Sequence, residues 1–167
     1  MKSSIVFVTV GTTKFDKLIK TILCDDILNE LNKRGYNHLI LQIGNTTIEP
    51  DCTPRCGFTA IEVFKLKPSL EQYMTSADLV ISHAGAGSCL EALEAKKPLI
   101  VVINDLLMDN HQYELAEQLC KDNHLYQCTC DTLLELLKTM DLSKLQPFIN
   151  NRSKEIAQII DHILGYS

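Results

Sequence analysis

A short stretch of small and polar residues, 82–88 (SHAGAGS), contains the residue types that bind phosphate groups. It follows the apolar run 79–81 and precedes a helical pattern that includes Leu90 and Leu93, which is typical of a strand, a tight loop and the start of a helix. A helix N-terminus offers free backbone N–H groups and a positive dipole end, and glycine lets a ligand approach the backbone closely. The stretch therefore predicts an anion-binding site.

The same pattern also has a purely structural explanation. Strand–glycine–helix turns reverse the chain in every α/β domain, and Ser88 with Glu91 three residues later matches a capping box, with Ser88 as the N-cap. Leu90 occupies the position of the third glycine in the dinucleotide fingerprint GxGxxG, which argues against a simple NAD-type site.

A second glycine follows another apolar run. Residues 4–10 (SIVFVTV) form a continuous apolar and β-branched segment, which is typical of a strand buried on both faces. Gly11, Thr12 and Thr13 come next, and apolar residues at helical spacing begin at Phe15. These residues are a second candidate phosphate cradle, or Thr12 or Thr13 is only a helix N-cap.

Similar apolar runs alternate with helical patterns along the rest of the chain. Further strands are predicted at 38–43, 57–64, 99–103 and 124–128, and helices at 15–22, 25–31, 69–76, 110–121, 131–140 and about 151–164. This alternation predicts a single α/β domain over residues 1–167, with a Rossmann-like parallel sheet and helices on both faces. Ligands of such sheets bind beyond the carboxyl ends of the strands, so the loops 11–13, 82–88 and 104–112 are expected to line one rim.

Composition narrows the class of protein. The 167 residues are 46% hydrophobic and 22% charged, as in ordinary globular domains. The net charge of −5 without blocks of like charge argues against a nucleic-acid partner. The apolar run 98–103 is too short to span a membrane, and the N-terminus has the character of a strand instead of a signal peptide. A cytoplasmic protein is expected.

The seven cysteines are expected to be free thiols in a reducing compartment. Cys128 and Cys130 form a CxC pair, and Cys52 and Cys56 a CxxxC pair interrupted by Pro54. Neither matches the paired CxxC spacing of zinc sites, so buried or incidental cysteines are the expected explanation.

Several segments together resemble one family. They are FVTVGTT at 7–13, LILQIG at 39–44, ADLVISHAGAGSCLEAL at 77–93, KPLIVVIN at 97–104 and DNHQYELAEQL at 109–119. They resemble the soluble catalytic subunit of the two-subunit UDP-N-acetylglucosamine (UDP-GlcNAc) transferase of dolichol-linked oligosaccharide synthesis. That subunit is similar to the C-terminal, donor-binding half of a GT-B glycosyltransferase.

The resemblance implies a reaction and a partner. N-acetylglucosamine would pass from UDP-GlcNAc to the acceptor GlcNAc-diphosphodolichol, the second step of lipid-linked oligosaccharide synthesis for N-glycosylation. A GT-B enzyme has two domains, and this chain is too short for both. A membrane-anchored second subunit is therefore implied, forming a heterodimer at the cytosolic face of the endoplasmic reticulum, and the chain alone would be inactive. Helix 151–164 would dock on this partner through an isoleucine-rich stripe, or it packs on its own sheet.

The resemblance also assigns donor-site roles. Glu91 would hold the ribose hydroxyls, because a carboxylate accepts two hydrogen bonds. His111 and Gln112 would bind the sugar hydroxyls, and residues 64–66 would lie near the uracil. The positions expected around the diphosphate and ribose are Gly11, Thr12, Ser82, Gly85, Ala86, Gly87 and Ser88.

His83 has three candidate roles. It donates to a phosphate oxygen as UDP leaves, acts as general base, or only hydrogen-bonds the loop. A bacterial relative has arginine at the corresponding place, which favours the phosphate contact and leaves the base to the partner. No DxD-like acidic pair lies beside the glycine loops, so no metal and no other cofactor is expected.

Two other functions stay open at this stage. The chain could be a stand-alone enzyme on a small phosphorylated substrate, which would turn over without a partner. It could also be a non-catalytic nucleotide-binding module, in which Glu91, His111 and Gln112 are replaceable without loss of transfer.

Overall fold

The structure is a computed structural model that describes residues 3–104 and 110–148. Its centre is one six-stranded sheet in which every pairing is parallel. The strands are β1 (Ile5–Thr9), β2 (His38–Gln42), β3 (Ala60–Phe64), β4 (Leu79–His83), β5 (Leu99–Ile103) and β6 (Tyr126–Thr129). The predicted strands are all confirmed, with bounds that differ by a few residues.

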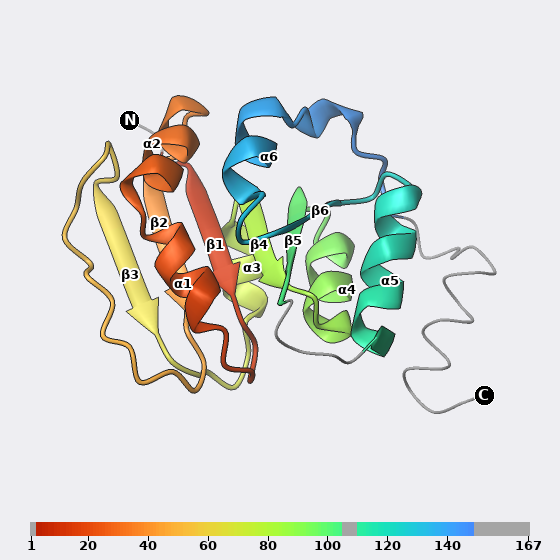
Figure 1. Cartoon of the computed structure of the whole chain (residues 1–167), viewed down its shortest axis with the longest axis horizontal. Helices are drawn as coiled ribbons and strands as arrows, with labels where there is room; N and C mark the ends of the chain where they lie inside the picture. Colours follow the sequence, from red (N-terminus) through yellow and green to blue (C-terminus); the bar gives the residue numbers. More distant parts are fainter. Residues whose placement is uncertain (1–2, 105–109, 149–167) are drawn as a thin grey trace.

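Helices cover both faces of this sheet (Figure 1). They are α1 (Asp16–Ile22), α2 (Asp25–Lys33), α3 (Glu71–Ser76), α4 (Ala86–Glu94), α5 (Asn110–Lys121) and α6 (Leu133–Thr139), followed by the 3-10 turn η1 (Leu142–Lys144). Because successive strand residues point to opposite faces, Val6 and Val8 pack in the core under α1, α2 and α6, whereas Phe7 packs in the core under α3, α4 and α5. The predicted Rossmann-like architecture is confirmed.

The strand order β3-β2-β1-β4-β5-β6 reverses direction next to the first strand. The chain moves outward from β1 to β2 and β3, and then returns to place β4 on the other side of β1. Thr9 and Ser82 are register partners at the carboxyl ends of these two strands. The loops after β1 and β4 therefore leave the sheet side by side, at the position where doubly wound sheets bind their ligands.

Buried polar side chains gather at the carboxyl ends of the strands. We call this end of the sheet the carboxyl edge and the opposite end the amino edge. The buried polar residues among those described are Thr9, Gln42, Thr46, Ser82 and Asn104. Each lies at or just beyond the carboxyl end of β1, β2, β4 or β5. Burying polar groups is costly unless they are hydrogen-bonded, so this edge needs an organised network.

Two helix caps suggested by the sequence are wrong. The N-cap of α4 is Gly85, whose carbonyl accepts from Cys89 N at 3.0 Å, so Ser88 is already the third residue of the helix and forms no capping box. The first helix begins at Asp16, and neither Thr12 nor Thr13 caps it, because the Thr13 hydroxyl donates to the Val10 carbonyl at 2.7 Å. In both loops the backbone makes the turn itself before the helix begins.

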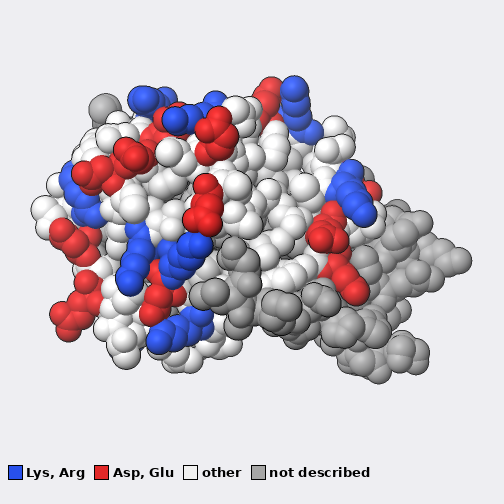
Figure 2. All heavy atoms as spheres, viewed as in Figure 1, with Lys and Arg blue, Asp and Glu red and all other residues white. Residues whose placement is uncertain are grey.

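Within residues 3–104 and 110–148, none of the helices has the length and apolarity needed to cross a bilayer. Figure 2 shows basic and acidic side chains interspersed over the visible face, with no extended basic patch on it. The predicted helix 151–164 lies outside the described residues.

Candidate functional site

The imidazole of His83 lies between the two glycine loops. A Cβ atom added to Gly11 would lie 2.7 Å from Nε2 of His83, and one added to Gly85 would lie 2.3 Å from its Cε1. Gly11 also has a φ of +61°, which disfavours other residues. The loops after β1 and β4 therefore close on one ring, and both glycines are required by contact with it.

His83 is a neutral base in this environment. Burial lowers the pKa of its imidazole from 6.5 to about 4. In the described parts of the chain, neither ring nitrogen has a hydrogen-bond partner, although the backbone carbonyl of His83 accepts from Ser82 Oγ at 2.8 Å. A neutral imidazole has one donor and one acceptor nitrogen. The ring can therefore donate to a phosphate oxygen without carrying a charge of its own.

The first turn of α4 contributes free backbone donors beside this ring. The N–H groups of Ala86, Gly87 and Ser88 lie in the first turn, where no intrahelical partner exists. Gly87 is exposed, and a Cβ atom there would meet nothing within 4 Å. The protein itself therefore does not require glycine at this position, and close approach by a ligand is a reason for it.

Two other predicted diphosphate residues lie in contrasting surroundings. Ser82 is fully buried, and its hydroxyl bond to the His83 carbonyl keeps it inside the protein. Thr12 is exposed on the loop after β1, where its carbonyl accepts from Asn45 Nδ2 at 3.0 Å. Thr12 is therefore accessible at the rim, whereas Ser82 stabilises the start of the loop after β4 from inside the protein.

Sequence reasoning missed the residue that organises this edge, Gln42. Its Oε1 accepts from Thr9 Oγ1 at 2.5 Å and from the Gly11 amide at 2.8 Å. Its Nε2 donates to the carbonyls of Gly11 and Lys65, each at 2.7 Å. The available signal was a single amide side chain inside the apolar run HLILQI, which was predicted to be a strand.

Glu91 lies half-buried on the side of α4 that faces α3. It lines a hollow of about 370 Å³ together with Ser69, Met74 and Thr75. Ser69 follows residues 64–66, which the resemblance places near the uracil, by three positions. The carboxylate predicted to hold the ribose thus lies beside the continuation of that segment, and its contact with residues 64–66 stays a prediction.

That segment carries an aromatic and cationic cluster. The rings of Phe64 and Tyr73 lie 4.7 Å apart, and Lys67 Nζ lies 4.9 Å from the centre of the Phe64 ring. Lys67 also bonds the Tyr73 hydroxyl at 2.5 Å, which lowers the pKa of that hydroxyl. Leu66 between them is 53% exposed. The cluster offers flat apolar surface beside a positive charge at the rim.

The remaining predicted residues are His111 and Gln112. They belong to the first turn of α5, which follows β5 at the same edge of the sheet. The structure describes the backbone of these two residues but not their side chains, so the prediction that they bind sugar hydroxyls stays a prediction.

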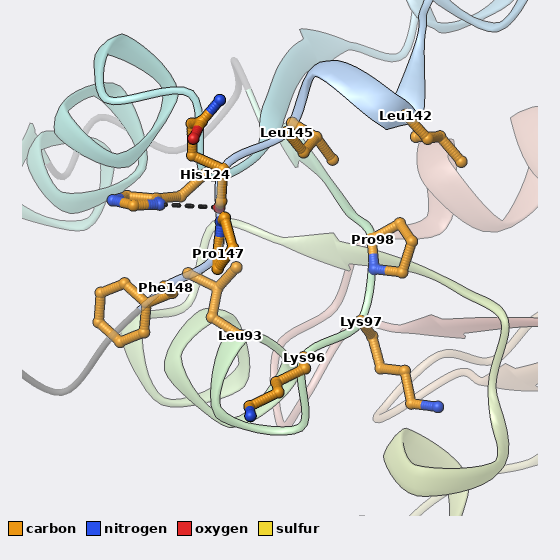
Figure 3. A pocket seen from close by; sticks show the side chains of 10 residues that line it. Leu93, Lys96, Lys97, Pro98, His124, Leu142, Leu145, Pro147 and Phe148 are labelled. Carbon is orange, nitrogen blue, oxygen red and sulfur yellow. Dashed lines mark hydrogen bonds between the residues drawn. The ribbon is translucent and has the colours of Figure 1, made fainter.

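The structure also has a cavity far from this edge, at the amino ends of β5 and β6. It measures about 280 Å³ and is lined by Leu93, Pro98, His124, Leu145 and Phe148, among others. Figure 3 shows the side chains of Lys96 and Lys97 diverging at its border instead of converging on it. Its His124 is already engaged, with Nδ1 3.1 Å from the Gln146 carbonyl. The cavity therefore lacks a built anion site.

Comparison with known proteins gives the family. The model of the glycosyltransferase family 28 C-terminal domain matches residues 5–163. The UDP-N-acetylglucosamine transferase subunit ALG13 of Homo sapiens is 56% identical over 128 residues, which cover 77% of this chain and 11% of the human protein. The subunit of the same name from Saccharomyces cerevisiae is 34% identical, and the match covers 86% of this chain and 87% of the yeast protein. The chain thus spans about a tenth of the mouse and human relatives and most of the yeast one.

Solved structures agree with this result. The NMR solution structure of ALG13 matches with a TM-score of 0.69 and 28% identity, covering 96% of this chain and 95% of that one. The crystal structure of Acinetobacter baumannii MurG matches with a TM-score of 0.62, covering 86% of this chain and 43% of that one, and at 19% identity it shows the fold alone. The chain belongs to the glycosyltransferase family 28 C-terminal domain family.

Proposed function

We propose that this chain is the donor-binding subunit of a UDP-GlcNAc transferase that extends GlcNAc-diphosphodolichol by one N-acetylglucosamine. Family membership and the names of the relatives support the donor and the reaction class. The structural observation that carries the proposal is the closure of two glycine loops on His83, beside the first turn of α4. Free amides, a helix dipole and a neutral donor together suit a nucleotide diphosphate.

Each group has a role in this proposal. The diphosphate lies between Gly11 and the first turn of α4, and Glu91 accepts hydrogen bonds from the ribose hydroxyls. An acceptor hydroxyl attacks the anomeric carbon, and the bond from that carbon to the diphosphate oxygen breaks. His83 donates an N–H to a phosphate oxygen as negative charge develops there. The proton of the attacking hydroxyl passes to a base on the partner subunit.

Donor binding in this proposal is independent of metal ions. Among residues 3–104 and 110–148, no group of three or more His, Cys, Asp and Glu residues is arranged to hold a metal. Backbone amides and His83 compensate the diphosphate charge instead. Adding a chelator should leave the affinity for UDP-GlcNAc unchanged, and loss of binding on chelation would contradict this part of the proposal.

The acceptor half of the enzyme comes from a membrane-anchored partner in this proposal. The relatives are named subunits, which supports an assembly. The isoleucine-rich stripe of residues 151–164 is the proposed docking element, and recruitment by the partner places the chain at the cytosolic face of the endoplasmic reticulum. Replacing Ile159 and Ile163 with glutamate should abolish recruitment to membranes while UDP-GlcNAc binding persists. Simultaneous loss of folding would show that the stripe packs on its own domain.

Calorimetric titration with UDP-GlcNAc tests the donor site. A hydrogen bond to a charged group contributes about 1.5–3 kcal/mol, so Glu91→Ala should weaken binding about tenfold to a hundredfold. Glu94→Ala is the matched control, because Glu94 lines the same hollow one turn further along α4. Its affinity should stay within about twofold of the wild type.

Other outcomes of the UDP-GlcNAc titration would contradict parts of the proposal. Binding that is unaffected by Glu91→Ala would keep the donor but reject this map of the site. If the intact chain does not bind, the titration is repeated with the co-expressed membrane subunit. Binding only then would show that the partner completes the site, and its continued absence would reject the proposed function.

A further inference from the structure

We propose that Gln42 is a positioning residue that sets the distance between the diphosphate loop and the base segment of the donor site. This inference rests on the proposed function for the identity of the donor. Its structural basis is one buried amide that contacts the loop after β1 and the segment after β3 at once.

Gln42 lies where it can reach both neighbours. It is the last residue of β2, and its register partners are Thr9 of β1 and Phe64 of β3. Since β2 lies between β1 and β3 in the sheet, a side chain at its carboxyl end stands between the two loops that follow them. Gln42 is only 1% exposed, so it acts through these loops and does not touch the donor itself.

The orientation of its amide follows from its partners. Oε1 faces the N–H groups of Gly11 and Val10, at 2.8 and 3.2 Å. Nε2 faces the carbonyls of Gly11 and Lys65, at 2.7 Å each. A flipped amide would set N–H against N–H and oxygen against oxygen, so only this orientation satisfies every group.

These contacts make glutamine specifically suited to the position. Gly11 is bound at both its N–H and its carbonyl, which fixes the peptide groups on either side of its left-handed backbone. Both carbonyls are held by the two hydrogens of one NH₂ group, so the Gly11 loop and the Lys65 segment cannot separate while it is in place. A carboxylate cannot donate to either carbonyl, and an apolar side chain of equal length would leave them without this donor.

The consequence concerns a ligand that spans both loops. A nucleoside diphosphate must place its phosphates at Gly11 and its base near Lys65 together, and preorganised spacing reduces the cost of ordering the site on binding. Lys65 has a second anchor, since its carbonyl also accepts from Gly44 N at 3.1 Å. The Gly11 N–H also has a second, longer partner, Thr9 Oγ1 at 3.2 Å, whereas in the described part of the chain Gln42 is the sole donor to the Gly11 carbonyl. Loss of Gln42 should therefore release mainly the Gly11 side, through its carbonyl.

The test uses the full chain and two readouts, the hydrogen-exchange rate of the Gly11 amide and the affinity for UDP. Gln42→Met keeps the length of the side chain and removes both donors and the acceptor. We expect Gly11 exchange to become faster and UDP affinity to become weaker, each by about tenfold or more. If Gln42→Met does not fold, Gln42→Asn replaces it, because it keeps the amide but withdraws it by one methylene.

Asn37→Ala is the matched control at the opposite edge of the same strand pair. Asn37 Oδ1 accepts from Ser4 N at 2.9 Å, so its loss also removes a side-chain bond, here between the residues that directly precede β1 and β2. Gly11 exchange and UDP affinity should stay within about twofold of the wild type in this control.

Three results would overturn the inference. They are unchanged Gly11 exchange in a folded Gln42 variant, unchanged UDP affinity in that variant, and equal effects of Asn37→Ala, which would indicate general destabilisation. Failure of the wild-type chain to bind UDP counts against the proposed function instead, and the exchange rate of Gly11 then decides by itself whether Gln42 holds the loop.

Discussion

The carboxyl and amino edges of the sheet differ in the polar side chains that they bury. At the carboxyl edge, Thr9 and Gln42 end their strands and Ser82 is the penultimate residue of β4. All three are buried and hydrogen-bonded, Thr9 to Gln42, Gln42 also to the loop after β1, and Ser82 to the His83 carbonyl. At the amino edge, half-buried Asn37 accepts from Ser4 N and exposed Asp78 accepts from Ile5 N. A largely apolar-lined cavity lies beside β5 and β6 at the same edge.

The two edges belong to strands with the same apolar interior. Val6 to Val8 and Leu39 to Leu41 are buried over most of their length, so the interior gives no preference for either end. The difference arises in the last one or two residues of each strand. A buried polar network is costly unless it is fully satisfied. Its position at the carboxyl edge in the described part of the chain supports the proposed donor site there.

The largest effect is expected from Gly85→Ala. Its new Cβ atom would lie 2.3 Å from Cε1 of His83, so the ring must shift out of its place beside Gly11. We expect a loss of about 1–3 kcal/mol in the free energy of unfolding and a loss of about a hundredfold in UDP affinity.

Gly35→Ala is the corresponding change near the amino edge. Gly35 has no atom within 4 Å of an added Cβ, but its φ of +98° strains any other residue. It should cost about 1 kcal/mol of stability with unchanged UDP affinity. Equal loss of affinity in both variants would contradict the difference between the edges.

His83 should make the free energy of unfolding depend on pH. Its folded pKa of about 4 lies below the ordinary 6.5, so the unfolded chain binds the extra proton between these values. This contribution to stability is complete above pH 6.5 and is lost as the pH falls toward 4. Allowing for partial exposure of the ring, we expect this contribution to the free energy of unfolding to be about 2 kcal/mol.

Urea unfolding at several pH values measures this term. His83→Gln should reduce the dependence of stability on pH across that window relative to the wild type. Identical pH profiles for the wild type and His83→Gln would show that the ring is not buried as a neutral base.

Gly87→Ala should separate binding from folding. Because the space around its Cβ position is open, the free energy of unfolding should change little or rise slightly. The added methyl group would occupy the approach to the first turn of α4, so we expect a threefold to tenfold loss of UDP affinity, about 1 kcal/mol. Unchanged affinity would indicate that the diphosphate does not bind at this turn.

The smallest effect on binding is expected at the cavity of the amino edge. Leu145→Ala enlarges that cavity, and partial loss of packing should cost about 1–2 kcal/mol of stability. UDP affinity should stay within about twofold, because the cavity and the glycine loops lie at opposite ends of the strands. A larger change would show that the two edges are coupled.

The fold was predictable because its signals are local. The continuous apolar run of residues 4–10 marks a buried parallel strand, and Gly11 marks its end. The start of α4 was not predictable from Ser88 and Glu91, because Gly85 caps the helix with its backbone and uses no side chain. A side-chain pattern cannot reveal a cap that has no side chain.

The candidate site was predictable only as a set of segments. The glycines and His83 were identified from their order in the chain, whereas the contact of one ring with both Gly11 and Gly85 depends on the register of β1 and β4. Gln42 escaped because its partners are mostly backbone groups that lie more than twenty residues away in the sequence. Such tertiary contacts have only one visible sign in the sequence, which is a polar residue within an apolar run.

The central claim is that the donor binds at the carboxyl edge of β1 and β4, and an NMR titration of the labelled full chain with UDP tests it most directly. We predict that the amide signals of Gly11, Lys65 and residues 83–88 move on binding, while those of residues 142–148 at the amino edge stay in place. Movement confined to residues 142–148, with the amides of Gly11 and Gly87 unchanged, would contradict the account.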